Sequence, residues 1–242
     1  MFHRVKNLRF LFCAIACVCV VARAADIDTI EQRALPCTPC HGKEGRAAVD
    51  GYYPRIAGKP AEYLFNQLLN FRDGRRFFPM MNYLTERQQE DFLQELAGYF
   101  ASQELPYAAP VPPKVSAAVL DRGHRLVTDG DAAVKLPACV ACHGTNLMGT
   151  LPAVPGLIGV SQYYLDAQIA AWKNGTRQAK APDCMARIAK QLSTEDIGAV
   201  TAWLSSQVVP DGARPQAQPE RPPPIECGSM QVTGAARAGK TP

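Results

Sequence analysis

The chain has 242 residues, with 26 lysines and arginines against 22 aspartates and glutamates. The first 24 residues hold four of the basic side chains and no acidic one, so the rest of the chain is neutral in formal charge. A neutral chain lacks the basic surface that binds DNA or RNA, so we exclude nucleic acid as a partner. The length suits two domains of about 100 residues each better than one small domain.

Residues 1–24 have the composition of a secretory signal peptide. A basic start is followed by an apolar run over residues 11–21, and Ala22 and Ala24 supply the small residues of a cleavage site. The apolar run is too short to span a bilayer comfortably, although an uncleaved membrane anchor is the alternative interpretation. We therefore expect export to the periplasm.

Residues 25–105 form the first predicted domain, which opens on an attachment motif for c-type haem. Cys37, Cys40 and His41 form the pattern C-x-x-C-H. Residues three apart lie on one face of a helical turn, so both thiols can reach the two vinyl groups of one porphyrin. The histidine that follows then presents a ring nitrogen to the iron as an axial ligand.

Two helices are predicted after this motif. Tyr63, Leu64, Leu68 and Phe71 follow helical spacing, and Gly74 ends that helix. A terminal helix carries Leu93, Leu96 and Phe100 at intervals of three and four residues. Residues 106–113 are uncharged and rich in proline, which predicts a stiff, extended linker.

Residues 114–210 form the second predicted domain, and they repeat the first. Cys139, Cys142 and His143 form a second C-x-x-C-H motif. Two such motifs 102 residues apart do not suit a zinc site, whose cysteine pairs usually lie within about 20 residues of each other. Nor does a buried strand precede either motif, as a thioredoxin-like redox pair requires.

The similarity between the halves extends well beyond the motifs. Pro54 matches Pro155, Tyr63 matches Tyr164, Gln67 matches Gln168, Phe71 matches Trp172, Gly74 matches Gly175, Arg76 matches Arg177, and Tyr99 matches Trp203. An internal duplication of about 100 residues is therefore predicted, with a helix, a haem motif and further helices in each half.

The repeat also locates candidates for the second axial ligand of each iron. A haem that only transfers electrons usually has both axial positions filled by the protein. Met185 lies 18 residues before Trp203, and the same count back from Tyr99 reaches Met81. Met80 is the alternative to Met81. Met148 follows His143 too closely to reach the opposite haem face, and His124 is expected at the surface.

Residues 211–242 hold six prolines and four glycines and show no helical period, so an irregular tail is predicted. Cys184 and Cys227 are the two cysteines that remain when the signal segment and the haem motifs are set aside. In an exported protein two such thiols most often pair, so we predict a disulfide between them. The alternatives are a free Cys184 that binds iron in place of Met185, and a Cys227 that pairs between molecules.

On these motifs the sequence resembles the tandem dihaem class I cytochromes c of the cytochrome c4 type, over about residues 26–210. The resemblance implies an all-α fold of two cytochrome c-like domains, each around one covalent haem, with the haem propionates near their interface. It also implies electron transfer by a protein that is soluble or loosely associated with a membrane. The proline-rich tail is an addition to that pattern, and the segment before Met81 is three residues shorter than the one before Met185.

The predicted function is an electron carrier with two covalent haem c groups. Histidine and methionine ligation raises the haem potential compared with two histidines. Such a carrier suits a quinol–cytochrome c oxidoreductase or a dehydrogenase as donor, and a terminal oxidase or reductase as acceptor. The alternatives are an enzyme (a dihaem peroxidase or a thiosulfate-oxidising cytochrome) and a fixed electron-transfer subunit of a membrane dehydrogenase.

The two halves also differ in charge. Residues 25–105 hold nine basic and twelve acidic side chains, and residues 114–210 hold nine basic and seven acidic ones. This asymmetry predicts a dipolar molecule that steers different partners to its two ends.

Overall fold

The computed structural model describes residues 28–47 and 51–230. The predicted signal peptide therefore lies outside the described residues. The described part of the chain is helical with one very short sheet, in agreement with the predicted all-α class. None of the helices in these ranges is long and apolar enough to cross a membrane.

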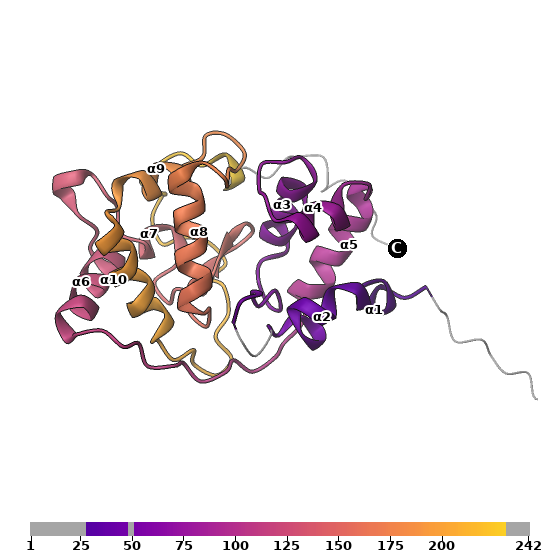
Figure 1. Cartoon of the computed structure of the whole chain (residues 1–242), viewed down its shortest axis with the longest axis horizontal. Coiled ribbons are helices and arrows are strands. Elements are labelled where there is room, and N and C mark those ends of the chain that lie inside the picture. Colours follow the sequence, from indigo (N-terminus) through magenta and orange to yellow (C-terminus); the bar gives the residue numbers. More distant parts are fainter. Residues whose placement is uncertain (1–27, 48–50, 231–242) are drawn as a thin grey trace, which may run out of the picture.

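The first half contains five α-helices and two short 3-10 turns. In chain order they are α1 (Ile30–Arg33), η1 (Leu35–Cys37), α2 (Thr38–His41), η2 (Lys43–Gly45), α3 (Ala61–Arg72), α4 (Pro79–Thr85) and α5 (Glu90–Ala101). Helix α3 packs along α5 (Figure 1). Their buried faces supply Leu64, Leu96 and Phe100, residues of the predicted helical pattern, to the core of this half.

The second half repeats this order. It contains α6 (Ala117–Thr128), η3 (Ala132–Val134), α7 (Val140–His143), α8 (Gln162–Asn174), α9 (Cys184–Gln191) and α10 (Thr194–Ser205). Helices α6 and α10 pack tightly together, and Leu126, Ile197 and Val200 lie in the core between them and α8. Ser193 caps α10 by accepting a hydrogen bond from the Asp196 amide, and serine is a preferred residue at this position.

The short sheet was not predicted. Strand β1 (Gly149–Thr150) pairs with β2 (Val154–Pro155) in antiparallel register, in the segment after the second motif. Two-residue strands carry no alternation of apolar and polar side chains, so the sequence gives no signal for them.

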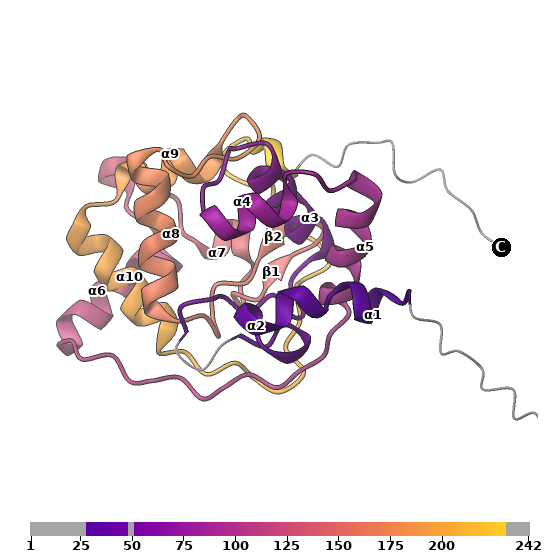
Figure 2. The ribbon, with the colours of Figure 1, turned by 45° about the vertical axis from the view of Figure 1, so that its right-hand side comes forward.

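The methionines predicted to bind iron lie on separate short helices. Met80 and Met81 belong to α4, which Pro79 begins, and Met185 belongs to α9, which Asp183 caps. Figures 1 and 2 show α4 and α9 next to the longer helices α3 and α8 of their respective halves.

The linker and the tail run along both halves. Residues 106–113 contain no helix or strand, and residues 211–230 of the tail contain no regular element except η4 (Gly228–Met230). The tail is nevertheless tied down, because Gln216 continues the edge of the short sheet through backbone hydrogen bonds with Gly149 and Leu151. The linker and the tail thus lie against the two halves (Figure 2).

Candidate functional site

The first C-x-x-C-H motif forms a tight helical turn. Cys37 ends η1, and Cys40 and His41 lie in α2, so the two thiols and the imidazole come from one short stretch of helix. His41 is buried, and its Nδ1 lies 2.9 Å from the carbonyl oxygen of Pro54. A carbonyl oxygen only accepts hydrogen bonds, so Nδ1 carries the proton and Nε2 is left with a lone pair for a metal.

The second motif repeats this arrangement. His143 is buried in α7, and its Nδ1 lies 2.8 Å from the carbonyl oxygen of Pro155, the residue that matches Pro54. Burial lowers the pKa of both His41 and His143, which favours the neutral imidazole that coordinates iron. Each half therefore orients one imidazole by a hydrogen bond to the backbone.

The four motif cysteines form no disulfide. Burial raises the pKa of Cys37 to about 11 and that of Cys139 to about 12, with smaller contributions from Cys40 and Cys142. The thiols of Cys37 and Cys139 are therefore protonated at neutral pH and are poor nucleophiles, unlike those of a thiol redox enzyme. Their position beside the imidazole suits covalent attachment of a porphyrin.

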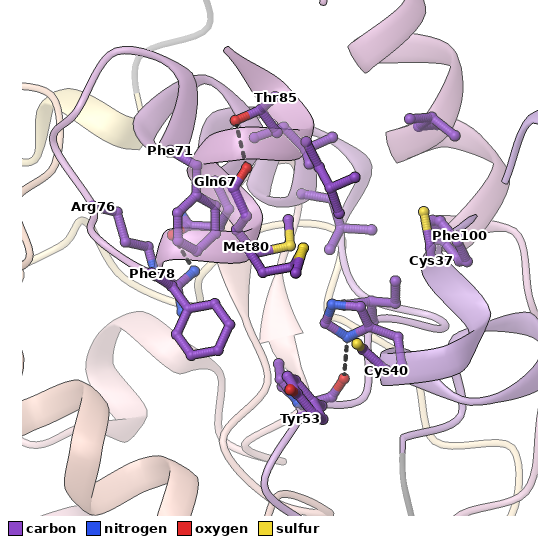
Figure 3. A pocket seen from close by; sticks show the side chains of 18 of the residues that line it. Cys37, Cys40, Tyr53, Gln67, Phe71, Arg76, Phe78, Met80, Thr85 and Phe100 are labelled. Carbon is purple, nitrogen blue, oxygen red and sulfur yellow. Dashed lines mark hydrogen bonds between the residues drawn. The ribbon is translucent and has the colours of Figure 1, made fainter. Parts of the chain in front are cut away.

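A cavity of about 510 Å³ lies over the first motif. Cys37, Cys40 and His41 line part of it. Side chains of α3, α4 and α5, of the loops of the first half, and of α8 from the second half line the rest. Figure 3 shows the cysteines on one side of this space and Met80, Phe71 and Gln67 on the other. A largely apolar wall with a few polar groups fits a porphyrin, so the residues present fit haem c.

Both candidate methionines of the first half line this cavity. Met80 is 52% exposed, whereas Met81 is partly buried. In the second half Met185 is also partly buried, at the start of α9. Met148 is 4% exposed within the core of that half, and His124 is exposed against the ring of Trp203. Iron ligation by Met81 and Met185 stays a prediction.

Two buried arginines meet where the halves join, and backbone groups of Arg76 and Arg177 form an isolated bridge. Arg76 donates to Gln67, at 3.0 Å, and to Gln168, at 2.7 Å. Arg177 donates to the same two glutamines, at 2.7 Å to Gln168 and 2.8 Å to Gln67. The matched positions of the repeat therefore form one symmetric network, to which Tyr164 adds an acceptor for Arg76.

Neither guanidinium of this network pairs with a carboxylate of the described residues, although salt bridges do occupy the neighbouring arginines. Arg72 pairs with Asp73 and Glu90, and Arg75 pairs with Asp73, all near the surface. Burial and the charge of Arg76 lower the pKa of Arg177 to about 10. Two buried cations close together are unfavourable unless anions compensate their charge, and the carboxylates of a haem would supply those anions.

Cys184 and Cys227 are joined by a disulfide, as the sequence predicts. The Cys184 sulfur is thus occupied, which disfavours its role as an iron ligand in place of Met185. The bond attaches the tail to the first residue of α9, next to Met185.

Arg55 is a buried residue to which the sequence assigned no role. It donates to the carbonyl oxygens of Leu105 and Pro106, at 2.6 Å and 3.0 Å, and its guanidinium lies 3.9 Å from the ring centroid of Tyr107. It thereby fixes the start of the linker to the first half. Its match in the second half is Gly156, so the repeat itself gave no signal for this role.

Comparisons with known proteins agree with this geometry. Residues 121–207 match the family model described as cytochrome c. The chain is 35% identical to the "Thiosulfate dehydrogenase electron acceptor" of Thiomonas intermedia, over 72% of this chain and 79% of that protein. It is 30% identical to the "Cytochrome c4" of Pseudomonas aeruginosa, over 75% of this chain and 88% of that protein.

Solved structures give the same picture. Reduced cytochrome c4 from Pseudomonas stutzeri superposes with a TM-score of 0.64 at 26% identity, covering 76% of this chain and 99% of that one. A thiosulfate dehydrogenase (TsdBA) from Marichromatium purpuratum gives a TM-score of 0.64 at 30% identity, covering 72% of this chain and 36% of that one. The chain belongs to the cytochrome c4 family of class I c-type cytochromes, whose cofactor is covalent haem c.

Proposed function

We propose that the protein is an exported electron carrier of the periplasm that holds two haem c groups. Cys37 and Cys40 attach the first, with His41 and Met81 as its axial ligands. Cys139 and Cys142 attach the second, with His143 and Met185 as its axial ligands. The observation that carries this proposal is the duplication of the oriented imidazole, in which Pro54 and Pro155 each bind one histidine.

The residues of the chain would act by positioning the haems, which supply reversible one-electron chemistry at iron. The backbone carbonyls fix each imidazole, and the fixed imidazole needs no reorientation when the charge of the iron changes. The shared network of Gln67, Arg76, Gln168 and Arg177 holds the two halves in one arrangement. That arrangement would keep the distance between the two haems constant and so sustain transfer between them.

The partners proposed for this carrier are redox proteins. A quinol–cytochrome c oxidoreductase or a dehydrogenase would donate electrons, and a terminal oxidase or reductase would accept them. An enzyme such as a peroxidase needs an iron with an open axial position. The methionines of α4 and α9 fill that position in our proposal, which favours a carrier.

A second candidate function is more specific: acceptance of electrons from a thiosulfate dehydrogenase. Relatives in Thiomonas intermedia and Stutzerimonas stutzeri, at 35% and 32% identity, carry the name of such an acceptor. The TsdBA structure, of which this chain covers about a third, suggests that a similar module can be joined to the enzyme itself. In this reading the protein oxidises no thiosulfate but receives the electrons released.

The mass of the intact protein, purified from the periplasm of a host that matures c-type cytochromes, tests the haem number and the export. We expect cleavage of the first 24 residues and two haem additions, and the double variant Cys139→Ala, Cys142→Ala should retain one. A one-haem wild type would contradict the proposal. Carbon monoxide binding to the reduced protein would instead indicate an open iron and favour the enzyme.

The second candidate is tested by mixing the oxidised protein with a purified thiosulfate dehydrogenase and thiosulfate. Reduction of the haems that requires both enzyme and thiosulfate would support it. Reduction by neither would exclude this donor and leave the general carrier function intact.

A further inference from the structure

Helix α4, which carries Met80 and Met81, and the segment just before it expose several large apolar side chains. Phe77 is 70% exposed, Tyr83 is 71% exposed, and Met80 and Leu84 are exposed beside them. We call these four residues the α4 patch. Phe77, Met80 and Leu84 also line the cavity over the first haem motif, so the patch borders the space that would hold the first haem. Exposed apolar side chains gathered in this way mark interaction sites.

The matching surface of the second half is less apolar and less exposed. Counting from the paired arginines and the paired methionines, Phe77 matches Gln178, Met80 matches Cys184, Tyr83 matches Arg187 and Leu84 matches Ile188. Two apolar residues are thus replaced by polar ones. Ile188 packs against the core of its half instead of being exposed.

The tail of the chain covers what remains of this second surface. Cys227 is bonded to Cys184, the match of Met80. The Gly228 amide donates to the Pro182 carbonyl at 2.9 Å, and a Cβ on Gly228 would lie 2.1 Å from the Ala181 oxygen. Asn66 of α3 also donates to the Ser229 carbonyl, at 3.3 Å. In Figures 1 and 2 the last described part of the tail, in yellow, accordingly lies between α9 and the first half.

We propose that the α4 patch is the docking surface for the protein that donates electrons, and that the disulfide-bonded tail closes the equivalent surface of the second half. Electrons would then enter at the first haem site and reach the second through the joined halves. This inference rests on the proposed function and specifies where the donor binds.

Charge indicates what kind of donor surface fits. Residues 25–105 hold twelve acidic and nine basic side chains. Arg55 and Arg76 are buried, so the surface of this half is more acidic than that count suggests. Glu86, Glu90 and Asp91 follow the patch directly, at the end of α4 and the start of α5. Arg87 pairs with Glu86 and Arg72 with Glu90, so this segment keeps a smaller acidic excess. The donor should therefore present an apolar face surrounded by lysines and arginines, because opposite charges speed encounter and apolar contact allows close approach.

The repeat supplies the test variants. Phe77→Gln and Tyr83→Arg transplant the residues of the closed half onto the open one, and neither residue is a proposed iron ligand. The control is Val134→Gln, which removes a 48% exposed apolar side chain from the second half. All proteins are used as full-length, haem-loaded chains. Ascorbate, a small reductant that needs no docking surface, should reduce every variant at the wild-type rate.

The measured quantity is the second-order rate constant for reduction by a thiosulfate dehydrogenase supplied with thiosulfate. We expect the double variant to be at least about tenfold slower than wild type, as for the loss of interface anchor residues. Val134→Gln should match wild type, and salt should slow wild type. Equal rates for wild type and the double variant would overturn the assignment of the docking surface and leave the proposed function intact.

Two other outcomes would overturn the inference differently. A wild type that the enzyme cannot reduce would show that this donor is wrong, and the docking assignment would fall with it. Sedimentation of a wild-type dimer that the double variant dissociates would identify a second copy of the chain as the occupant of the patch.

Discussion

Met80 and Met81 are neighbours in the sequence but differ in their surroundings. Both line the first cavity, yet Met80 is the more exposed of the two, and the Met81 carbonyl accepts a hydrogen bond from Thr85 at 2.8 Å. A buried thioether is better placed to bind an iron atom than one shared with solvent.

Substitution of these two residues separates their roles. Met81→Ala should remove about half of the weak red absorption band that methionine-bound ferric haem produces, because one of two irons loses its sulfur ligand. Met80→Ala, the matched control, should keep the full band. Loss of the band in Met80→Ala and its retention in Met81→Ala would reverse the assignment.

At the scale of single residues, the sequence predicts what is local. The motif residues Cys37, Cys40 and His41 lie within one helical turn, so their spacing alone indicates their chemistry. The repeat pairs Arg76 with Arg177 but assigns no role to either residue. The role of Arg76 depends on Gln168, which is 92 residues away. Contacts at such separation leave no periodic signal in one sequence.

At the scale of elements, the crossing of α6 and α10 depends on one glycine. A Cβ on Gly123 of α6 would lie 2.1 Å from the carbonyl oxygen of Ala199, a contact that real Cβ atoms do not make. The backbones of the two helices therefore approach each other closely at this point. Gly198 of α10, by contrast, has nothing within 4 Å of its would-be Cβ.

Gly123→Ala should lower the free energy of unfolding of the second half by about 1–3 kcal/mol, since the helices must move apart. Gly198→Ala should leave that free energy unchanged or raise it by up to about 1 kcal/mol, because alanine favours a helix. Denaturant unfolding followed by helical circular dichroism measures both. Equal effects of the two variants would contradict this account of the crossing.

A charged cluster also joins α6 to α10. Arg122 donates to Asp196 at 2.8 Å and to Asp131 at 3.2 Å. The hydrogen bond from Arg122 holds the pKa of Asp196 below its ordinary value of 3.8. A carboxyl group whose pKa is lower in the folded state stabilises the fold above its unfolded pKa, and this contribution is lost as the pH falls through the folded value.

Arg122→Gln should therefore reduce stability at pH 7 by about 0.5–1 kcal/mol, a modest amount because both side chains reach solvent. The difference from wild type should shrink as the pH falls below 3.8 and through the lowered folded pKa of Asp196, because protonation removes the charge of this carboxylate in both proteins. Thermal unfolding at pH 7 and in acid measures it. A difference that persists in acid would show that packing by Arg122, and not its charge, is responsible.

Helix positions were largely predictable, because helical spacing and end signals are local. Helix α3 spans the predicted Tyr63 to Phe71 and ends before Gly74, whose φ of 75° suits glycine. The placement of Met81 and Met185 on short helices was not predicted. Helices α4 and α9 have 7 and 8 residues, too few for a clear period.

At the scale of the whole molecule, several connections hold the halves together. Among them are the Gln–Arg network between α3 and α8, the linker held by Arg55, and the tail that reaches Asn66. The sequence predicts the linker and the disulfide. It does not predict that the linker and the tail each contact both halves. An irregular tail was expected, and its fixed course depends on distant acceptors such as the Gly149 carbonyl.

The attachment of the linker depends on the shape of one side chain. The Arg55 guanidinium donates to three carbonyl oxygens, those of Ala57, Leu105 and Pro106, and lies over the ring of Tyr107. Tyr107 in turn packs against the core of the second half. A lysine ammonium keeps the charge but lacks the planar fork that binds several acceptors and stacks on a ring.

Arg55→Lys should therefore loosen the linker while leaving both haem sites intact. We expect protease cleavage within residues 106–113 to become about tenfold faster, since each lost bond from a charged donor is worth about 1.5–3 kcal/mol. The haem absorption spectrum should not change. Arg46→Lys is the matched control, because Arg46 is an exposed arginine whose side-chain bonds to described residues go to nearby Lys43 and Glu44. Cleavage at the wild-type rate in Arg55→Lys would show that Tyr107 alone holds the linker, and equal acceleration in both variants would show a general loss of stability instead.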